Sequence, residues 1–401
     1  MLSKQVNERL TQVSAGTPMG ELLRRYWHPV ATVPELDAEP VLAVTILGEN
    51  LALFRSDSGT LGLVAQRCPH RGASLAYGIP EEDGLRCAYH GWKFARGGQC
   101  LEQPAEPADS TFKDRIRIPA YPVQEMGGLI WAYLGPDPAP LLPRYDLFVR
   151  DDVEREIGIT RLPCNWLQIM ENSLDPVHLE YLHSVYMNYV FKRAGKPEPT
   201  TTKHHERIAF DVFEYGITKR RLWVGDSEDS DEWQVGHPIL FPNILSVGEP
   251  RFPQFQIRVP MDDTHTYHVW YRCKSTSDGV AARQSPHDIP VLDYAYKEQN
   301  GRLIVETVSG QDMMVWVTQG PISDRTTERL GTTDQGIILY RNLLLDQITR
   351  VERGEDPLAV IRDEAKNTPM VQIHREAEPF RVAAGDNDAF AARHERGTAP
   401  V

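Results

Sequence analysis

Two short segments that each combine one cysteine with one histidine constrain the fold of this chain more than any other feature. Sixteen residues separate the first histidine from the second cysteine, and the segments read Cys68-Pro69-His70-Arg71-Gly72 and Cys87-Ala88-Tyr89-His90-Gly91-Trp92. Two thiolates and two imidazoles can bind zinc or an asymmetric iron–sulfur cluster. Zinc fingers usually keep a cysteine pair apart from a histidine pair, whereas each segment here mixes the two. The order therefore favours a [2Fe–2S] cluster in which one iron takes both sulfurs and the other both imidazoles.

A second pattern of metal-binding residue types lies downstream, where Asp175, His178 and His183 follow one another closely. Two histidines and a carboxylate form the triad of non-haem Fe(II) oxygenases. His178 and His183 are five residues apart, however, which is about 140° around an ideal helix. They can share a metal only if the helix bends between them or if the metal lies over one edge. Taken alone, the pair is equally well explained as two partly buried helix histidines.

Together the two patterns resemble the Rieske non-haem iron aromatic ring-hydroxylating oxygenases. The α (oxygenase) subunits of that family carry Cys-x-His, Cys-x₂-His and Asn-x₂-Asp-x₂-His-x₄-His motifs. Other segments are similar to the phthalate dioxygenase group, and the similarity extends over nearly the whole chain. These segments are residues 17–27, 260–263, 320–325 and 330–334.

The resemblance implies a role for each residue of the motifs. Cys68 and Cys87 would bind one iron of the [2Fe–2S] cluster, and His70 and His90 the other. Histidine ligation raises the reduction potential above that of all-cysteine clusters.

The resemblance also implies a separate Fe(II) bound by His178 and His183. Asp175 would not bind this iron but would link His178 to His90 of a neighbouring subunit. The third ligand is expected to be a carboxylate on a late helix, a few residues before a glutamine. Asp312 fits this description because Gln319 follows it, and Glu306 and Asp324 are its rivals.

The expected fold class is α+β. Residues 1–40 are predicted to form a short helix and an extended arm, and residues 41–150 an all-β Rieske domain. Gly48-Glu49 is a hairpin signal in that domain, and four prolines at 136–143 indicate a linker. Residues 151–375 are predicted to form a helix-grip catalytic domain, with an antiparallel sheet and a long amphipathic helix at 335–353. A surface tail is expected at 376–401.

Composition excludes several classes of protein. No apolar stretch of the chain is long enough to cross a membrane, and the N-terminus lacks a signal core, so the cytoplasm is the expected location. The formal net charge is −13 and no basic block is present, which argues against nucleic acid as a partner. Cys100, Cys164 and Cys273 have no partners in the motifs and are expected to be free thiols. An acidic surface would suit a basic electron donor, although solubility explains it equally well.

The resemblance implies an oxygenase component that inserts oxygen from O₂ into an aromatic substrate, with a carboxylated ring favoured. No Gly-x-Gly-x-x-Gly element is present for a nicotinamide or flavin cofactor, so a separate reductase must supply electrons. In the phthalate dioxygenase group this partner carries FMN and a plant-type ferredoxin domain, and the oxygenase subunits commonly form a head-to-tail homotrimer. Arg220, Arg221 and Arg258 are candidates to hold a substrate carboxylate.

Three alternatives remain open at this stage. Ring dihydroxylation is the expected reaction, but O-demethylation, another monooxygenation or diaryl ether cleavage would use the same centres. A Rieske electron carrier would need only the first motif. A helix-grip binding domain without the second iron would need neither histidine of the second pair. Iron content distinguishes an oxygenase, with about three irons per chain, from a carrier or an iron-free binding domain, each with about two.

Overall fold

The first forty residues contain three helices and a strand, where the sequence predicted one helix and an arm. The computed structural model, which describes residues 1–276 and 279–376, has α1 (Lys4–Thr11), α2 (Pro18–Leu23), β1 (Trp27–Thr32) and α3 (Val33–Ala38) here. Thr17 caps α2 by accepting a hydrogen bond from Gly20 N, and Thr32 forms a capping box with Glu35. The strand β1 pairs with β11 of the following domain. This segment is therefore integrated into the N-terminal β-rich part.

The predicted hairpin forms, but its turn lies one residue earlier than expected. Its strands are β2 (Val41–Ile46) and β3 (Glu49–Arg55). Leu47 and Gly48 both have positive φ, 48° and 78°, as a type I′ turn requires. Leu47 N donates to Pro260 O at 3.0 Å and Gly48 N donates to Met261 O at 2.8 Å. The tip of this hairpin therefore fastens the N-terminal part to the catalytic part.

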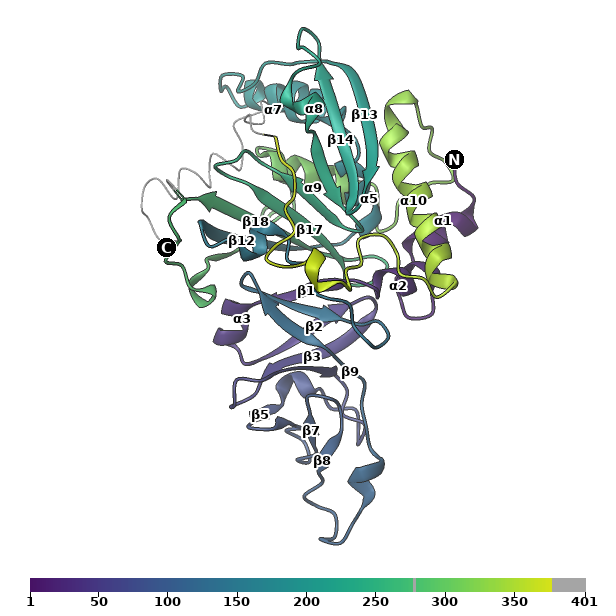
Figure 1. Ribbon diagram of the computed structural model, residues 1–401, viewed down its shortest axis with the longest axis vertical. Helices are drawn as coiled ribbons and strands as arrows, with labels where there is room; N and C mark the ends of the chain where they lie inside the picture. The colour runs from purple at the N-terminus through teal and green to yellow at the C-terminus, as the bar shows by residue number, and fades with distance from the viewer. Residues whose placement is uncertain (277–278, 377–401) are drawn as a thin grey trace.

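Three small sheets build the N-terminal part. Their strand orders are β2-β3-β4-β9, β5-β6-β7-β8 and β1-β11-β10. The remaining elements are β4 (Leu61–Ala65), η1 (Leu75–Tyr77), β5 (Ile79–Glu81), β6 (Gly84–Arg86), β7 (Lys93–Ala95), β8 (Cys100–Glu102), η2 (Phe112–Arg115), β9 (Ala120–Tyr121), β10 (Val123–Met126) and β11 (Leu129–Tyr133). The sheet that contains β5, β7 and β8 lies at the far end of the molecule from the large sheet (Figure 1).

The catalytic part contains an eight-stranded sheet in the order β13-β14-β15-β16-β17-β18-β12-β19, antiparallel except where β12 meets β19. Its strands are β12 (Val153–Leu162), β13 (His205–Phe213), β14 (Gly216–Trp223), β15 (His237–Leu240), β16 (Ile244–Val247), β17 (Gln254–Pro260), β18 (Thr266–Ser275) and β19 (Val291–Asp293). The helices are α4 (Asp146–Val149), α5 (Trp166–Ser173), α6 (His178–Glu180), η3 (Tyr181–Tyr186), α7 (Met187–Arg193), α8 (Asp231–Gln234), η5 (Pro286–Asp288), α9 (Val308–Thr318), η6 (Thr332–Asp334), α10 (Gln335–Glu352) and η7 (Glu364–Lys366).

The long C-terminal helix α10 matches the helix predicted at 335–353. It buries Leu344, Ile348 and Val351, which recur at helical spacing. Near its start, a Cβ at Gly336 would lie 2.4 Å from the ring of Phe210 in β13. Only glycine allows α10 to approach the sheet so closely at this point.

The proline-rich stretch expected to be a linker is packed between the two parts. Trp27 donates to Pro140 O at 2.9 Å, and Leu141 N donates to Ile361 O at 2.9 Å. A single hydrophobic core cluster includes residues of both parts, among them Leu53, Trp131, Phe255 and Leu344. The two parts therefore do not move independently about this stretch.

No helix in the described ranges 1–276 and 279–376 is long and apolar enough to cross a bilayer. Of the tail expected at 376–401, all but Glu376 lies outside these ranges.

Candidate functional site

The two Cys/His segments fold into matching loops. In each loop the cysteine carbonyl accepts from a glycine four residues later, and the cysteine amide donates to a carbonyl five residues later. The contacts are Gly72 N to Cys68 O at 2.8 Å, Cys68 N to Ala73 O at 2.9 Å, Gly91 N to Cys87 O at 3.0 Å and Cys87 N to Trp92 O at 2.8 Å. Gly72 and Gly91 both have φ of 75°, which favours glycine.

The loops bury the sulfurs and present the imidazoles at the surface. Cys68 and Cys87 are 2% and 3% exposed, and burial raises the pKa of Cys68 to about 11, with Cys87 beside it. The rings of His70 and His90 lie 4.6 Å apart, and His70 stacks on Trp92. Adjacent buried thiols beneath adjacent imidazoles fit a [2Fe–2S] cluster whose histidine-bound iron faces outward.

A network of ion pairs supports the second loop from behind, and the sequence had not indicated it. Arg86 donates to Gly91 O at 2.7 Å and pairs with Glu102 at 2.7 Å. Lys93, which is 8% exposed, lies 3.1 Å from Asp83. These contacts hold the backbone that carries His90.

His178, His183 and Asp312 converge at the second site. His183 Nε2 lies 3.1 Å from Asp312 Oδ1 and His178 Nε2 lies 3.9 Å from the same oxygen. One ligand atom from each residue falls within 4.8 Å of the others, and no other such group of three occurs among the residues that the structure describes. Three ligands on one side leave coordination positions open, as non-haem Fe(II) chemistry requires. The donor set fits this metal.

A π-helical turn solves the spacing problem posed by His178 and His183. The helix α6 passes directly into η3 (Tyr181–Tyr186), which is a π-helix. A π turn closes its hydrogen bonds at i→i+5, so residues five apart lie closer to one face of the helix than they would in an α-helix. The π segment begins three residues after His178 and includes His183, and the rings of the two histidines lie 5.1 Å apart.

Backbone and side-chain carbonyls orient both imidazoles. His178 Nδ1 lies 2.5 Å from Asp175 O, and His183 Nδ1 lies 3.1 Å from Gln311 Oε1. The Gln311 amide nitrogen donates to Val305 O at 3.0 Å, which leaves its oxygen for the histidine. Each histidine therefore directs Nε2 toward Asp312. The sequence analysis missed Gln311, although it directly precedes Asp312.

Burial and neighbouring charges determine the protonation states of His178 and Asp312. Burial lowers the pKa of His178 to about 4, and His183 adds to the effect. Burial alone would raise the pKa of Asp312, but the neighbouring His183 and His178 outweigh it and hold that pKa below its usual value. The site therefore presents a neutral His178 imidazole and an ionised Asp312 carboxylate, the forms that bind a metal.

The two rival carboxylates lie elsewhere. Glu306 pairs with Arg302 at 2.8 Å, and Asp324 accepts from Thr326 N at 3.0 Å. Both have local partners and neither faces the histidines.

Asp175 lines a surface hollow of about 500 Å³ that His178 also lines. Its carboxylate accepts from Val177 N at 2.8 Å and lies 3.9 Å from His178 Nδ1. Tyr181 and Tyr186 line the same hollow. It thus gives access to an iron-site histidine from outside the chain.

The three candidate arginines have different environments. Arg220 pairs with Asp211 at 2.7 Å on the outer face of β14, away from the metal site. Arg221, on the opposite face, is fully buried and pairs with Glu232 at 3.1 Å and Glu376 at 3.6 Å.

Arg258 is 1% exposed and binds only Gln256, through the backbone oxygen at 3.0 Å and Oε1 at 2.9 Å, and no carboxylate of the described chain pairs with it. Burial lowers its pKa to about 9, opposed by the nearby charge of Asp312. Arg258 therefore combines a buried charge with a position near Asp312.

Comparison with known proteins agrees with these two centres. Residues 26–122 match the Rieske [2Fe-2S] domain, and residues 297–376 match a domain described as LigXa C-terminal domain like. The chain is 42% identical to the 5,5'-dehydrodivanillate O-demethylase oxygenase subunit of Sphingobium sp. (strain NBRC 103272 / SYK-6), over 98% of this chain and 92% of that one. The chain belongs to the Rieske oxygenases.

Other Rieske oxygenase subunits are similar over most of their length. The phenoxybenzoate dioxygenase subunit alpha of Ectopseudomonas oleovorans is 36% identical, over 89% of this chain and 88% of that one. The terminal oxygenase of carbazole 1,9a-dioxygenase from Novosphingobium sp. KA1 shares the fold, with a TM-score of 0.61 and 20% identity over 85% and 97% of the two chains. The fold prediction, an α+β chain with a Rieske domain before the catalytic domain, is confirmed.

Membership in this family also settles the cofactors and the class of activity. The chain is the oxygenase component of a multicomponent system, carries a [2Fe–2S] cluster and an Fe(II) centre, and receives electrons from a separate protein. The alternatives of an electron carrier and of an iron-free binding domain are thereby excluded.

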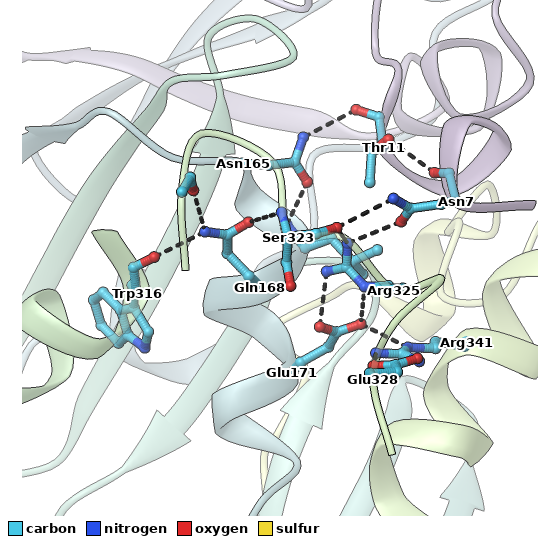
Figure 2. Close-up of polar contacts among 12 residues, drawn as sticks. Asn7, Thr11, Asn165, Gln168, Glu171, Trp316, Ser323, Arg325, Glu328 and Arg341 are labelled. Carbon is cyan, nitrogen blue, oxygen red and sulfur yellow. Dashed lines mark hydrogen bonds and ion pairs between the residues drawn. The ribbon is translucent and has the colours of Figure 1, made fainter. Parts of the chain in front are cut away.

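A buried polar network in this Rieske oxygenase holds the helices around the iron site (Figure 2). Glu171, on α5, pairs with Arg325 at 2.7 Å and with Arg341 of α10 at 2.7 Å. Gln168, one turn earlier, donates to Trp316 O of α9 at 2.8 Å and accepts from Ser323 N at 2.9 Å. The network therefore joins the helix before His178 to the helix that carries Asp312. The sequence offered no signal for these long-range pairs.

A buried lysine also escaped the sequence analysis. Lys219 lies two residues before Arg221 on β14, so both side chains point to the inner face of the sheet. Lys219 donates to Ser173 O at 2.9 Å. Burial lowers its pKa to about 7, and the charge of Arg221 contributes. Asp175 acts in the opposite direction, so Lys219 lies close to that carboxylate.

Proposed function

We propose that this Rieske oxygenase acts on an aromatic carboxylate and that Arg258 holds the carboxylate group. The supporting observation is a buried guanidinium without a carboxylate partner in the described ranges. A buried charge that lacks a counter-charge is costly unless a ligand supplies one, and arginine matches a carboxylate with two parallel hydrogen bonds. Three relatives are named for aromatic acids, namely phenoxybenzoate dioxygenase, phthalate 4,5-dioxygenase and 3-chlorobenzoate-3,4-dioxygenase.

Two reactions are compatible with such a substrate. The relative at 42% identity is named an O-demethylase, which favours removal of a methyl group from an aryl ether. The relatives named as dioxygenases favour ring dihydroxylation. Product analysis separates the two, because demethylation releases formaldehyde and a phenol, whereas dihydroxylation gives a cis-diol.

In this proposal, Cys68, Cys87, His70 and His90 hold the cluster. His178, His183 and Asp312 hold the Fe(II). When bound, the Fe(II) centre supplies the O₂ chemistry with electrons that arrive through the cluster. The chain's other residues position the substrate and keep each ligand in its binding form.

We also propose that the working unit is a head-to-tail homotrimer. In one chain the cluster loops lie at the opposite end from the catalytic sheet (Figure 1). Exposed aromatic residues flank both surfaces that would have to meet: Tyr89, 55% exposed, beside His90, and Tyr181, 59% exposed, in the hollow beside Asp175. Contact with a second copy would bury these rings and bring His90 to the partner subunit's Asp175.

The finer identity of the electron donor is part of the same proposal. Phthalate 4,5-dioxygenase is similar at 31% identity over 89% of both chains. We propose a reductase with FMN and a plant-type ferredoxin domain, as in that group. Reconstitution with such a reductase and substrate-dependent oxygen uptake would test this pairing.

Replacement of Arg258 by Met tests the carboxylate site. Loss of a charge-assisted contact should raise KM for aromatic acids about 10- to 100-fold, since such bonds contribute about 1.5–3 kcal/mol. Thermal stability should be kept, because an unpaired buried charge is removed. Arg220→Met is the matched control, and its KM should not change. Unchanged KM in Arg258→Met would contradict the proposal.

A further inference from the structure

A fully buried histidine next to Arg258 lacks hydrogen-bond partners. His268 of β18 is directly opposite Arg258 of β17 in the antiparallel register. It is 0% exposed, and neither ring nitrogen has a partner within residues 1–276 and 279–376. Buried polar groups almost always have a partner, because an unmet donor or acceptor destabilises the fold. This exception requires an explanation.

The surroundings of His268 belong to the region of the iron ligands. Its ring lies 4.1 Å from that of Trp270 and 5.4 Å from that of Trp316, almost parallel to the latter. Trp316 lies on α9 four residues after Asp312, which places both on one face of that helix. The imidazole is therefore held between aromatic rings beside the proposed substrate anchor.

Further unmet hydrogen-bonding atoms gather at the same place. Arg258 Nε and the Trp316 indole nitrogen are buried without a partner among the described residues. Arg258 is close enough to Asp312 for the two charges to influence each other. Unpartnered polar atoms on β17, β18 and α9 thus lie near one another and near Asp312, and a bound molecule with oxygen atoms would supply their missing partners.

We propose that His268 hydrogen-bonds an oxygen substituent on the ring of the substrate, so that the enzyme selects aromatic carboxylates that carry a hydroxyl or ether oxygen. This inference rests on the proposed function, in which Arg258 holds the carboxylate. The Cβ atoms of directly opposite residues on antiparallel strands lie about 4.5–5.5 Å apart, so the two side chains leave the sheet side by side on the same face. One ring can therefore contact both groups at once.

The protonation state of the imidazole suits this role. Burial holds the pKa of His268 well below its usual value, and the charges of Arg258 and Arg272 add to this effect. Through the one ring nitrogen that faces it, a neutral imidazole can either donate to a hydroxyl group or accept from it, depending on the tautomer. An ether oxygen can only accept, so it requires the tautomer in which that nitrogen carries the hydrogen.

Binding of matched acids to the iron-loaded holoenzyme tests the inference. The probes are 3-hydroxybenzoate against 3-methylbenzoate and 4-hydroxybenzoate against 4-methylbenzoate, because each pair differs in hydrogen bonding but little in size. The wild type should bind the hydroxylated member of at least one pair about tenfold more tightly or better. His268→Phe should abolish that preference while its affinity for the methyl analogue stays within about twofold. His268→Gln should restore part of the preference.

The same measurements separate this inference from the proposed function. Arg258→Met should weaken both members of a pair by a similar factor. If the wild type binds 3-hydroxybenzamide as tightly as 3-hydroxybenzoate, the carboxylate anchor is wrong. If it binds the acids but does not discriminate within either pair, only the role of His268 is wrong.

Thermal unfolding supplies an independent readout, since His268→Phe should raise the midpoint. A lower midpoint with loss of all binding would make His268 structural and overturn the inference.

Discussion

Single side chains determine which atoms of the iron site point inward. Gln311 accepts from His183 Nδ1, and its own amide nitrogen is committed to Val305 O. The orientation of the amide is therefore set by the protein, and it fixes the tautomer of His183. Partners of this kind typically contribute a factor of about 10–100 to metal affinity.

Gln311→Leu should lower the affinity for Fe(II) about 10- to 100-fold. The measurement is iron content after dialysis against a graded chelator, with the visible spectrum of the cluster as an internal reference. The spectrum should not change, because the cluster loops are remote. Gln319→Leu is the control, since Gln319 is exposed at the end of α9. Equal iron retention by both variants would remove Gln311 from the site.

Buried ion pairs between side chains join helices and loops around the proposed iron site. Glu171 of α5 faces both Arg325 and Arg341, and each of the three side chains is at most 10% exposed (Figure 2). Neutralising Glu171 leaves Arg325 without a carboxylate partner among the described residues, while Arg341 keeps Glu328. Breaking a buried ion group in this way typically costs about 3–5 kcal/mol. Surface pairs contribute about 0–1 kcal/mol.

Glu171→Gln should therefore reduce the free energy of unfolding by about 3–5 kcal/mol in urea denaturation followed by circular dichroism. Glu352→Gln breaks an exposed pair with Arg9 and should change stability by less than about 1 kcal/mol. A similar small effect of both substitutions would show that the Glu171 network does not stabilise the packing of α5 against α10.

The two proposed metal centres lie in different parts of the chain. The cluster loops lie at one end of the chain, and His178, His183 and Asp312 lie within the catalytic part (Figure 1). In the proposed head-to-tail ring, electrons would therefore reach the iron of a different copy, and each active site would be made from two subunits.

Subunit mixing tests this arrangement directly. Cys68→Ser should lose the cluster and His178→Ala the iron, and each variant alone should be inactive. Co-expressed in equal amounts, they should recover about a quarter of wild-type activity, because about one interface in four then joins an intact cluster to an intact iron site. Mixtures formed from the separately purified variants without subunit exchange serve as the control. No recovery after co-expression would contradict electron transfer between subunits.

The local motifs of the chain were sufficient for the chemistry of the cluster, whereas the histidine pair of the second site was ambiguous without the resemblance. Cys68-x-His70 and Cys87-x₂-His90 select a mixed sulfur and nitrogen cluster, because ligand type and spacing within one loop are local properties. Local patterns also predicted the hairpin, although they placed its turn at Gly48-Glu49 instead of Leu47-Gly48, and they predicted α10. The choice of Asp312 came from the resemblance, and the structure brings that residue to the histidines.

Other features depended on contacts between residues far apart in the sequence. The π turn that aligns His178 with His183, the pairing of Glu171 with Arg325 and Arg341, and the isolation of Arg258 beside His268 have no local signature. Arg220, Arg221 and Arg258 look alike in sequence, yet strand alternation and the neighbouring carboxylates give each a different environment. The sequence alone thus determined which groups can bind metal, since the type of each residue determines which ligand atoms it offers. Only the tertiary structure decided which charges are paired, because burial and counter-charges arise from packing.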